Sequence, residues 1–177
     1  MRFVAFLRGV NVGKHNRVRM DDLRQAIVGT GLKGVSTYLQ SGNVLLDGSD
    51  PNDVLSRVRR AIESLHLNAE VVLRSGVDME RVVAANPFGD DGSDDSHRFV
   101  TFLAEPVAVE MPATSPRGDW EVLLQTDLEV YSVARMVDGR YGAPNGLVEA
   151  KLGVLTTTRN WAVVRALSKL VGRLTPP

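Results

Sequence analysis

The apolar positions in the first half of the chain have the spacing of short buried strands. Four such strands are predicted by runs of apolar residues at 3–7, 34–40, 43–47 and 69–74. The tripeptide Ser-Gly-Asn between the second and third runs has the composition of a tight hairpin turn. We therefore expect the second and third strands to pair with each other.

Two segments between these runs have the 3.6-residue spacing of amphipathic helices. Residues 20–31 place Leu23 and Ile27 on one face, and a glycine can end this helix. Residues 50–67 begin with Asp50, a suitable N-cap, followed by a proline that fits the first turn. The resulting order, β-α-β-β-α-β, predicts the ferredoxin-like split βαβ arrangement.

A hexapeptide of the first half of the chain recurs, with one difference, in the second half. The sequence "RFVAFL" at 2–7 returns as "RFVTFL" at 98–103, which suggests a duplication. Beyond it the pattern predicts a helix at 79–85, two strands within 120–135, and a last helix that starts near Thr158. We therefore predict an α+β protein of two ferredoxin-like subdomains, 1–76 and 77–177, with the second packed on the first.

Composition excludes several chemistries. The 177 residues include no cysteine, which rules out disulfides, thiolate metal sites and a cysteine nucleophile. No apolar stretch approaches the ~18 residues of a membrane span. The N-terminal run also lacks a small-residue cleavage site. We therefore expect a cytoplasmic protein without a membrane partner.

Charge is balanced over the chain but unevenly distributed along it. Residues 1–20 carry five cations and no acid, and residues 150–177 do the same, whereas residues 86–149 carry twelve acids and four cations. If the two ends meet in space, they form a basic face. The alternative is that these charges are spread over separate solvated surfaces.

The stretch "RGVNVGKH" at 8–15 is the first candidate site. It is not a phosphate-binding P-loop, because only three residues separate Gly9 from Gly13 and His15 replaces the magnesium-binding hydroxyl. A looser anion site remains open, in which backbone amides converge and arginine and lysine side chains add charge-assisted hydrogen bonds. The alternative is an ordinary strand-to-helix loop whose glycines satisfy the turn.

Two further stretches combine amides, hydroxyls and cations. Residues 39–43 offer side chains that can read a base or a sugar, or can equally hold a hairpin together. In residues 156–161, Thr157 or Thr158 would cap the last helix. Arg159 and Asn160 would lie in its first turn, and Trp161 would stack on a ligand ring. The alternative is a capped helix with a buried tryptophan.

The histidines and the acidic run at 89–96 do not predict a metal site. His15, His66 and His97 lack neighbours that would suggest a triad or a metal pair. The aspartates of the acidic run lack the spacing and terminal glutamate of a calcium loop. We expect a solvated loop there and solvent-exposed histidines.

Four stretches taken together, "FLRGVNVGKHNRVRMDDLR", "TYLQSGNVLL", "NPF" and "LGVLTTTRNW", resemble the bacterial family known as domain of unknown function 1697. The resemblance covers nearly the whole chain. It implies a small cytoplasmic α+β protein with ferredoxin-like subdomains, and it implies no activity. The residues that match the family motifs are Arg8, Gly9, Asn11, Gly13, Asn16, Gln40, Ser41, Gly42, Asn43, Thr158, Arg159, Asn160 and Trp161.

Our leading hypothesis is a module that binds a phosphate-bearing ligand, a nucleotide or a nucleic acid, in a basic cleft between the subdomains. The predicted ligand-binding residues are Arg8, Asn11, Lys14, Asn16, Arg17, Gln40, Ser41, Asn43, Thr158, Arg159, Asn160 and Trp161. One alternative is an enzyme acting on a phosphorylated small molecule, for which Asp47 and His15 are the nearby acid–base candidates. The other is a structural or partner-binding protein. The sequence identifies no cofactor, and it leaves the oligomeric state open.

Overall fold

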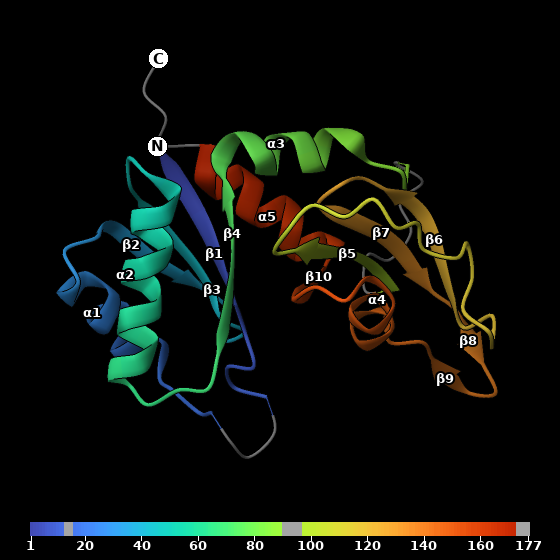
Figure 1. Cartoon of the computed structure of the whole chain (residues 1–177), viewed down its shortest axis with the longest axis horizontal. Helices are drawn as coiled ribbons and strands as arrows, with labels where there is room; N and C mark the ends of the chain where they lie inside the picture. Colours follow the sequence, from blue (N-terminus) through green and yellow to red (C-terminus); the bar gives the residue numbers. More distant parts are fainter. Residues whose placement is uncertain (13–15, 90–96, 173–177) are drawn as a thin grey trace. The chain divides into compact units, whose positions relative to one another are not determined.

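A computed structural model describes residues 1–12, 16–89 and 97–172 (Figure 1). These residues form two compact units. Of the described residues, the first unit comprises Met1–Glu80 and 167–172, and the second comprises those within Arg81–Ala166. The predicted subdomains 1–76 and 77–177, with the second packed on the first, stay a prediction.

The first unit contains the predicted ferredoxin-like arrangement. Its elements are β1 (Arg2–Arg8), α1 (Met20–Gly29), β2 (Lys33–Tyr38), β3 (Asn43–Asp47), α2 (Pro51–Ser64) and β4 (Glu70–Ser75). The strands pair antiparallel in the order β2-β3-β1-β4. Helices α1 and α2 pack on one face of this sheet (Figure 1).

Local sequence explains both helices of this unit. The Asp50 side chain accepts a hydrogen bond of 3.1 Å from the backbone amide of Asn52 and so caps α2, as predicted. Helix α1 buries Leu23 and Ile27, the residues that the helical spacing places on one face. Both helices thus bury apolar stripes against the sheet, and this packing forms the core of the unit.

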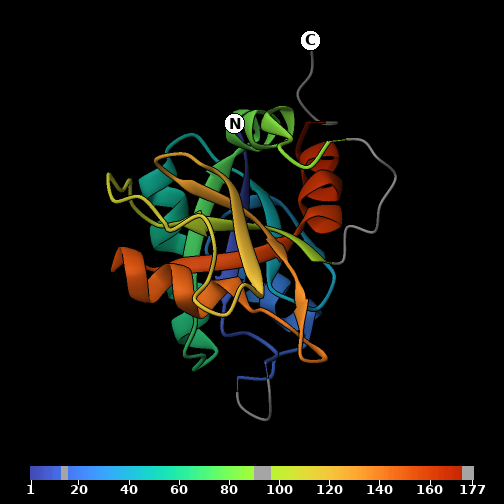
Figure 2. The same ribbon diagram turned by 90° about the vertical axis from the view of Figure 1, so that its right-hand side faces the viewer.

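The rest of the chain forms a second set of elements. They are α3 (Gly76–Ala85), β5 (Arg98–Leu103), β6 (Trp120–Gln125), β7 (Glu129–Ala134), β8 (Met136–Val137), β9 (Arg140–Tyr141), α4 (Pro144–Leu152), β10 (Thr156–Asn160) and α5 (Trp161–Gly172). Four strands pair antiparallel in the order β10-β5-β7-β6. Helix α4 packs against β10 and β5 (Figure 2).

The two sheets have the same topology. Strands β5, β6, β7 and β10 take the places that β1, β2, β3 and β4 take in the first sheet. The repeated hexapeptide forms the corresponding strands β1 and β5, and in both sheets the last strand runs directly into a helix, α3 or α5. The predicted α+β fold with an internal duplication is therefore confirmed. We call β1–α3 the first repeat and β5–α5 the second repeat.

The sequence pattern was wrong at the end of the chain. Residues 156–160 form β10, which pairs with β5 from Thr156 opposite Leu103 to Asn160 opposite Phe99, so the last helix begins at Trp161 and not near Thr158. The three consecutive threonines are β-branched and favour a strand. Helix α4 and the β8–β9 hairpin were not predicted. Leu147 on α4 is exposed, so the apolar residues of this helix do not form a clean stripe.

Within the described residues, every helix is either too short or too polar to cross a membrane.

Candidate functional site

Asn11 holds together the loop that follows β1. Its backbone has a left-handed φ of 57°, a conformation that asparagine tolerates better than most residues. The Asn11 side chain donates a hydrogen bond of 3.1 Å to the Val18 carbonyl and accepts one of 2.9 Å from the Val18 amide. Its backbone amide also donates to the Asn16 carbonyl at 2.9 Å. This side chain therefore closes the loop upon itself.

Asn16 ties the same loop to the segment that precedes β4. Its side chain donates to the Asn68 carbonyl at 2.7 Å and accepts from the Asn68 amide at 3.1 Å. Gly9 lies close to the same carbonyl, since a Cβ there would lie 3.3 Å from the Asn68 oxygen. The structure thus gives Asn16 a role in holding the loop. Lys14 lies outside the described residues.

The second predicted motif builds the turn between β2 and β3. Asn43 is fully buried (0% exposed), and its side chain donates to the Tyr38 carbonyl and to the Ser41 hydroxyl, both at 3.0 Å. Gly42 has a φ of 73°, and a Cβ there would approach Leu7 Cβ and the Leu7 carbonyl oxygen to 2.9 Å. Only glycine fits this position without a shift of the neighbouring strand.

The first two motifs meet at a pocket of about 550 Å³, which we call the α1 pocket. The Asn11 side chain joins them through a hydrogen bond of 2.9 Å to the Gln40 carbonyl. The pocket is lined by Asn11, Arg17, Val18, Arg19, Met20, Asp21, Thr37, Leu39 and Gln40. Of the predicted residues, Asn11, Arg17 and Gln40 thus line one cavity, whereas Arg8 does not line it.

Positive charge gathers at the α1 pocket where helix α1 begins. Arg17 and Arg19 are both exposed. Arg19 is the N-cap of α1, and no side chain caps the amides of the first turn. The one carboxylate of the lining, on Asp21, is engaged by Arg24, with Nη2–Oδ1 and Nε–Oδ1 distances of 2.8 and 3.2 Å. Through this hydrogen bond and its charge, Arg24 lowers the pKa of Asp21 below its usual value.

Leu39 is the lining residue that sequence reasoning missed most clearly. Its φ is 56°, in the left-handed region, where a residue with a Cβ pays roughly 1–2 kcal/mol. Its side chain is 54% exposed and lines the pocket. Strained residues persist where the surrounding structure determines them, often at ligand sites. The apolar run at 34–40 places Leu39 inside a predicted strand, but β2 ends at Tyr38, so Leu39 lies in the turn that follows.

The third motif occupies the junction between β10 and α5. The Asn160 carboxamide oxygen accepts a hydrogen bond of 3.0 Å from the Val163 amide and caps α5, so the cap predicted at Thr157 or Thr158 lies two or three residues later. The Thr158 hydroxyl instead pairs with the Thr101 hydroxyl at 2.8 Å across the sheet. The predicted position of Arg159 and Asn160 in the first helical turn is corrected, because both belong to β10.

Arg159 and Trp161 are largely withdrawn from solvent. Arg159 donates from Nη1 to the Thr157 hydroxyl at 2.9 Å and to the Thr158 carbonyl at 2.8 Å. Burial lowers the pKa of Arg159 to about 10, so the guanidinium remains charged at neutral pH. Trp161 is 2% exposed and packs its ring against Phe88, with ring centres 5.0 Å apart. Trp161 thus makes a core contact with Phe88.

Comparison with known proteins agrees with the sequence motifs. Residues 1–122 match the family described as protein of unknown function (DUF1697). The chain belongs to this family. Its fold is similar to that of conserved bacterial protein SP0830 from Streptococcus pneumoniae, with a TM-score of 0.67 and 18% identity over 96% of this chain and 98% of that one. At this identity the likeness shows the fold alone. A search of the curated proteins finds no match.

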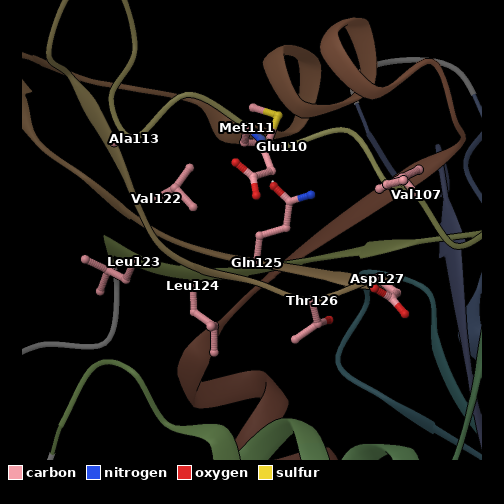
Figure 3. A pocket seen from close by; sticks show the side chains of 11 residues that line it. Val107, Glu110, Met111, Ala113, Val122, Leu123, Leu124, Gln125, Thr126 and Asp127 are labelled. Atoms are coloured by element: carbon pink, nitrogen blue, oxygen red, sulfur yellow. Dashed lines mark hydrogen bonds between the residues drawn. The ribbon is translucent and has the colours of Figure 1, made fainter.

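This DUF1697 chain has a second pocket, of about 490 Å³, along strand β6 (Figure 3). Its lining contains none of the residues predicted from the sequence. We call it the β6 pocket. Within the described ranges, no group of three or more histidine or acidic side chains could hold a metal ion. Most of the acidic run at 89–96, together with His15, lies outside those ranges.

Proposed function

We propose that the α1 pocket binds a phosphate-bearing ligand of nucleotide size. The observation that carries the proposal is the combination of two exposed arginines, Arg17 and Arg19, with the uncapped start of α1 in one cavity. Free amides at a helix N-terminus and its dipole favour an anion, and guanidinium groups add charge-assisted hydrogen bonds. A volume of about 550 Å³ lies within the range of small-molecule sites.

The apolar part of the lining supports a ligand that carries a ring as well as a phosphate. Val18, Met20 and Leu39 form this part, and Thr37 and Gln40 provide polar groups beside it. An exposed leucine held in a strained backbone conformation gains from being covered by a flat apolar surface. A nucleoside phosphate has both chemistries, whereas inorganic phosphate has only one.

The hydrogen bonds identify those predicted residues that hold loops in place. Asn11, Asn16 and Asn43 hold loops in place and so act on the ligand through the shape of the pocket. We assign the ligand contacts to two predicted residues, Arg17 and Gln40 through its side chain, and to Arg19, which was not among the predicted residues. Ligand contact by the other predicted residues, Arg8, Lys14, Ser41, Thr158, Arg159, Asn160 and Trp161, stays a prediction.

We propose binding rather than catalysis for this pocket. Its lining contains one carboxylate, Asp21, and that group is occupied by Arg24. A general base must reach the proton that it removes. An engaged carboxylate at the start of a helix does not meet that requirement.

Isothermal titration calorimetry with ATP, inorganic pyrophosphate and a ten-residue oligothymidylate tests the proposal. Wild-type protein should bind ATP more tightly than pyrophosphate. The double variant Arg17→Ala/Arg19→Ala should bind ATP at least tenfold more weakly, because each charge-assisted contact contributes about 1.5–3 kcal/mol. Tighter binding of the oligonucleotide than of ATP would extend the ligand class to nucleic acid.

The matched control is Arg59→Ala/Arg60→Ala on helix α2, which removes the same charge from two exposed positions of the same unit. It should change the affinity for ATP less than twofold. An equal loss in both double variants would show that only net charge matters, and no detectable ATP binding by the wild type would refute the proposal.

A further inference from the structure

The connection between the first two strands differs sharply between the repeats. In the first repeat it contains helix α1, but in the second repeat the connection, residues 104–119, has no helix. It contains prolines at positions 106, 112 and 116, which remove backbone donors and disfavour helix. The connection instead runs in extended form along β6, an edge strand of its sheet.

Backbone hydrogen bonds join this connection to the edge of the sheet at two places. At one end the Ser115 amide donates to the Trp120 carbonyl and the Val122 amide donates to the Ala113 carbonyl, both at 2.8 Å. At the other end the Val107 amide donates to the Asp127 carbonyl at 2.9 Å. The connection and the segment 120–127 are therefore joined by backbone hydrogen bonds at both ends of an opening that lies between them.

Between these ends, the side chain of Gln125 replaces the backbone ladder. Its carboxamide oxygen accepts from the Met111 amide at 2.8 Å, and its nitrogen donates to the Val109 carbonyl at 2.7 Å. A glutamine side chain plus one hydrogen bond is longer than the direct backbone hydrogen bond that joins paired strands. At Val109 and Met111 the connection is therefore bridged to β6 by a side chain, and an opening lies beside this bridge.

The β6 pocket occupies this opening. Figure 3 shows the lining residues of the connection on one side of it and residues 122–127 on the other. Met111, Val122 and Leu124 make its lining partly apolar, and the carboxylates of Glu110 and Asp127 belong to exposed residues of the same lining. Residues 104–127 carry five acids and one cation, Arg117. A strand entering here meets negative charge.

We propose that the β6 pocket binds an extended peptide segment in which lysine or arginine alternates with apolar residues. The segment displaces the Gln125 carboxamide and pairs with the edge of β6, as in other peptides that add a strand to a sheet. Its apolar side chains cover Val122 and Leu124, and its cations face Glu110 and Asp127. Charge complementarity makes the association dependent on salt.

The probe is the synthetic peptide acetyl-Lys-Val-Arg-Val-Lys-Val-amide, titrated into the full chain and followed by isothermal titration calorimetry. Saturable binding is expected, and the double variant Glu110→Gln/Asp127→Asn should weaken it at least fivefold. Gln125→Ala should tighten it severalfold, because the peptide then has no side chain to displace. Hydrogen exchange of residues 123–125 should slow in the complex.

Two control peptides separate strand pairing from charge alone. A peptide with glutamate at the three cationic positions should not bind, and neither should one with proline in place of the central valine, since proline cannot complete the ladder. Equal binding of the proline peptide would overturn the proposal. So would absence of saturation with the basic peptide, or an affinity that Glu110→Gln/Asp127→Asn leaves unchanged.

Discussion

The two repeats share a strand framework and differ in the connection that follows their first strand. In the first repeat, the loop that the Asn11 side chain closes by hydrogen bonds leads into α1, and the resulting pocket presents Arg17 and Arg19. In the second repeat, a proline-containing segment stays extended, and the resulting pocket presents Glu110 and Asp127. The strand order is therefore compatible with pockets of opposite charge, and the connections determine which chemistry each repeat carries.

The repeats also correspond at the end of their fourth strands. Arg74 and Arg159 both precede the residue that caps the following helix, and in both the Nη1 atom donates to the carbonyl of the preceding residue, at 2.9 and 2.8 Å. Because the two repeats make the same contact, it is a feature of the fold. Arg159 was predicted as a ligand contact because a cation at an expected helix start suits an anion, and its counterpart Arg74 shows that the position also has a structural use.

The first residues of helices α5 and α3 occupy corresponding positions in the two repeats. Substitutions there should differ most in how much they lower the free energy of unfolding. Trp161 starts α5 and is buried against Phe88, whereas Gly76 starts α3. Trp161→Ala should lower the free energy of unfolding by about 3–5 kcal/mol, the range for buried aromatic truncation. Gly76→Ala should change it by less than ~0.5 kcal/mol, because a Cβ there meets Val171 at an ordinary 3.4 Å.

Urea unfolding followed by circular dichroism measures both effects. If Trp161→Ala does not fold, Trp161→Phe keeps part of the aromatic contact and should cost roughly 1–2 kcal/mol. A cost below ~1 kcal/mol for Trp161→Ala would show that the tryptophan is not part of the core of the second unit.

Substitutions next to the turns that precede β3 and β7 should differ less in their effect on the free energy of unfolding. Asn43 and Glu129 both begin these strands and are both buried, and each bonds to its own turn. Asn43→Ala should cost about 2–3 kcal/mol, because it removes two hydrogen bonds and leaves the Tyr38 carbonyl without this donor. Glu129→Ala should cost about 1–2 kcal/mol, because the Glu129 amide still donates to the Thr126 hydroxyl.

The isosteric variant Asn43→Asp sharpens this test in the same unfolding assay. An ionised aspartate only accepts hydrogen bonds, so it cannot replace the donor to the Tyr38 carbonyl. It should destabilise the protein at least as much as Asn43→Ala, and a neutral effect would contradict the donor role.

Substitutions of the residues that cap α3 and α5 should differ least between the repeats in their effect on stability. The Ser75 hydroxyl accepts from the Asp78 amide and donates to the Asp78 carboxylate, whereas Asn160 makes one capping bond. Ser75→Ala should cost about 1–2 kcal/mol and Asn160→Ala about 1 kcal/mol in thermal unfolding. The exchange variants Ser75→Asn and Asn160→Ser should each stay within ~0.5 kcal/mol, and a larger loss would show that the caps are not equivalent.

Local spacing predicted the strands and helices of the first repeat because each depends on neighbours within a few residues. The strand at 156–160 was misassigned because a threonine run before a helix suits either a cap or a strand, and only pairing with β5 decides between them. Contacts between residues distant in the sequence also determine the roles of the candidate site residues. Asn16 bonds to Asn68, 52 residues away, so its holding role could not be read from its motif. Of the two cations of the α1 pocket, Arg17 was a predicted ligand-binding residue, whereas Arg19 was counted only as part of the basic stretch 1–20.

The α1 pocket contains one apolar residue with a left-handed backbone, Leu39, which has no equivalent in the described turn between β6 and β7. Its substitution allows a test with a smaller expected effect. Leu39→Gly relieves the left-handed backbone at 56° and should stabilise the protein by about 0.5–1 kcal/mol. It also removes the apolar wall, so the affinity for ATP should fall at least threefold. Leu39→Ala keeps the strain but loses the wall, so it should weaken ATP binding without raising stability. If Leu39→Gly gains stability at full affinity, the strain has no link to the ligand and the ring must bind elsewhere in the pocket.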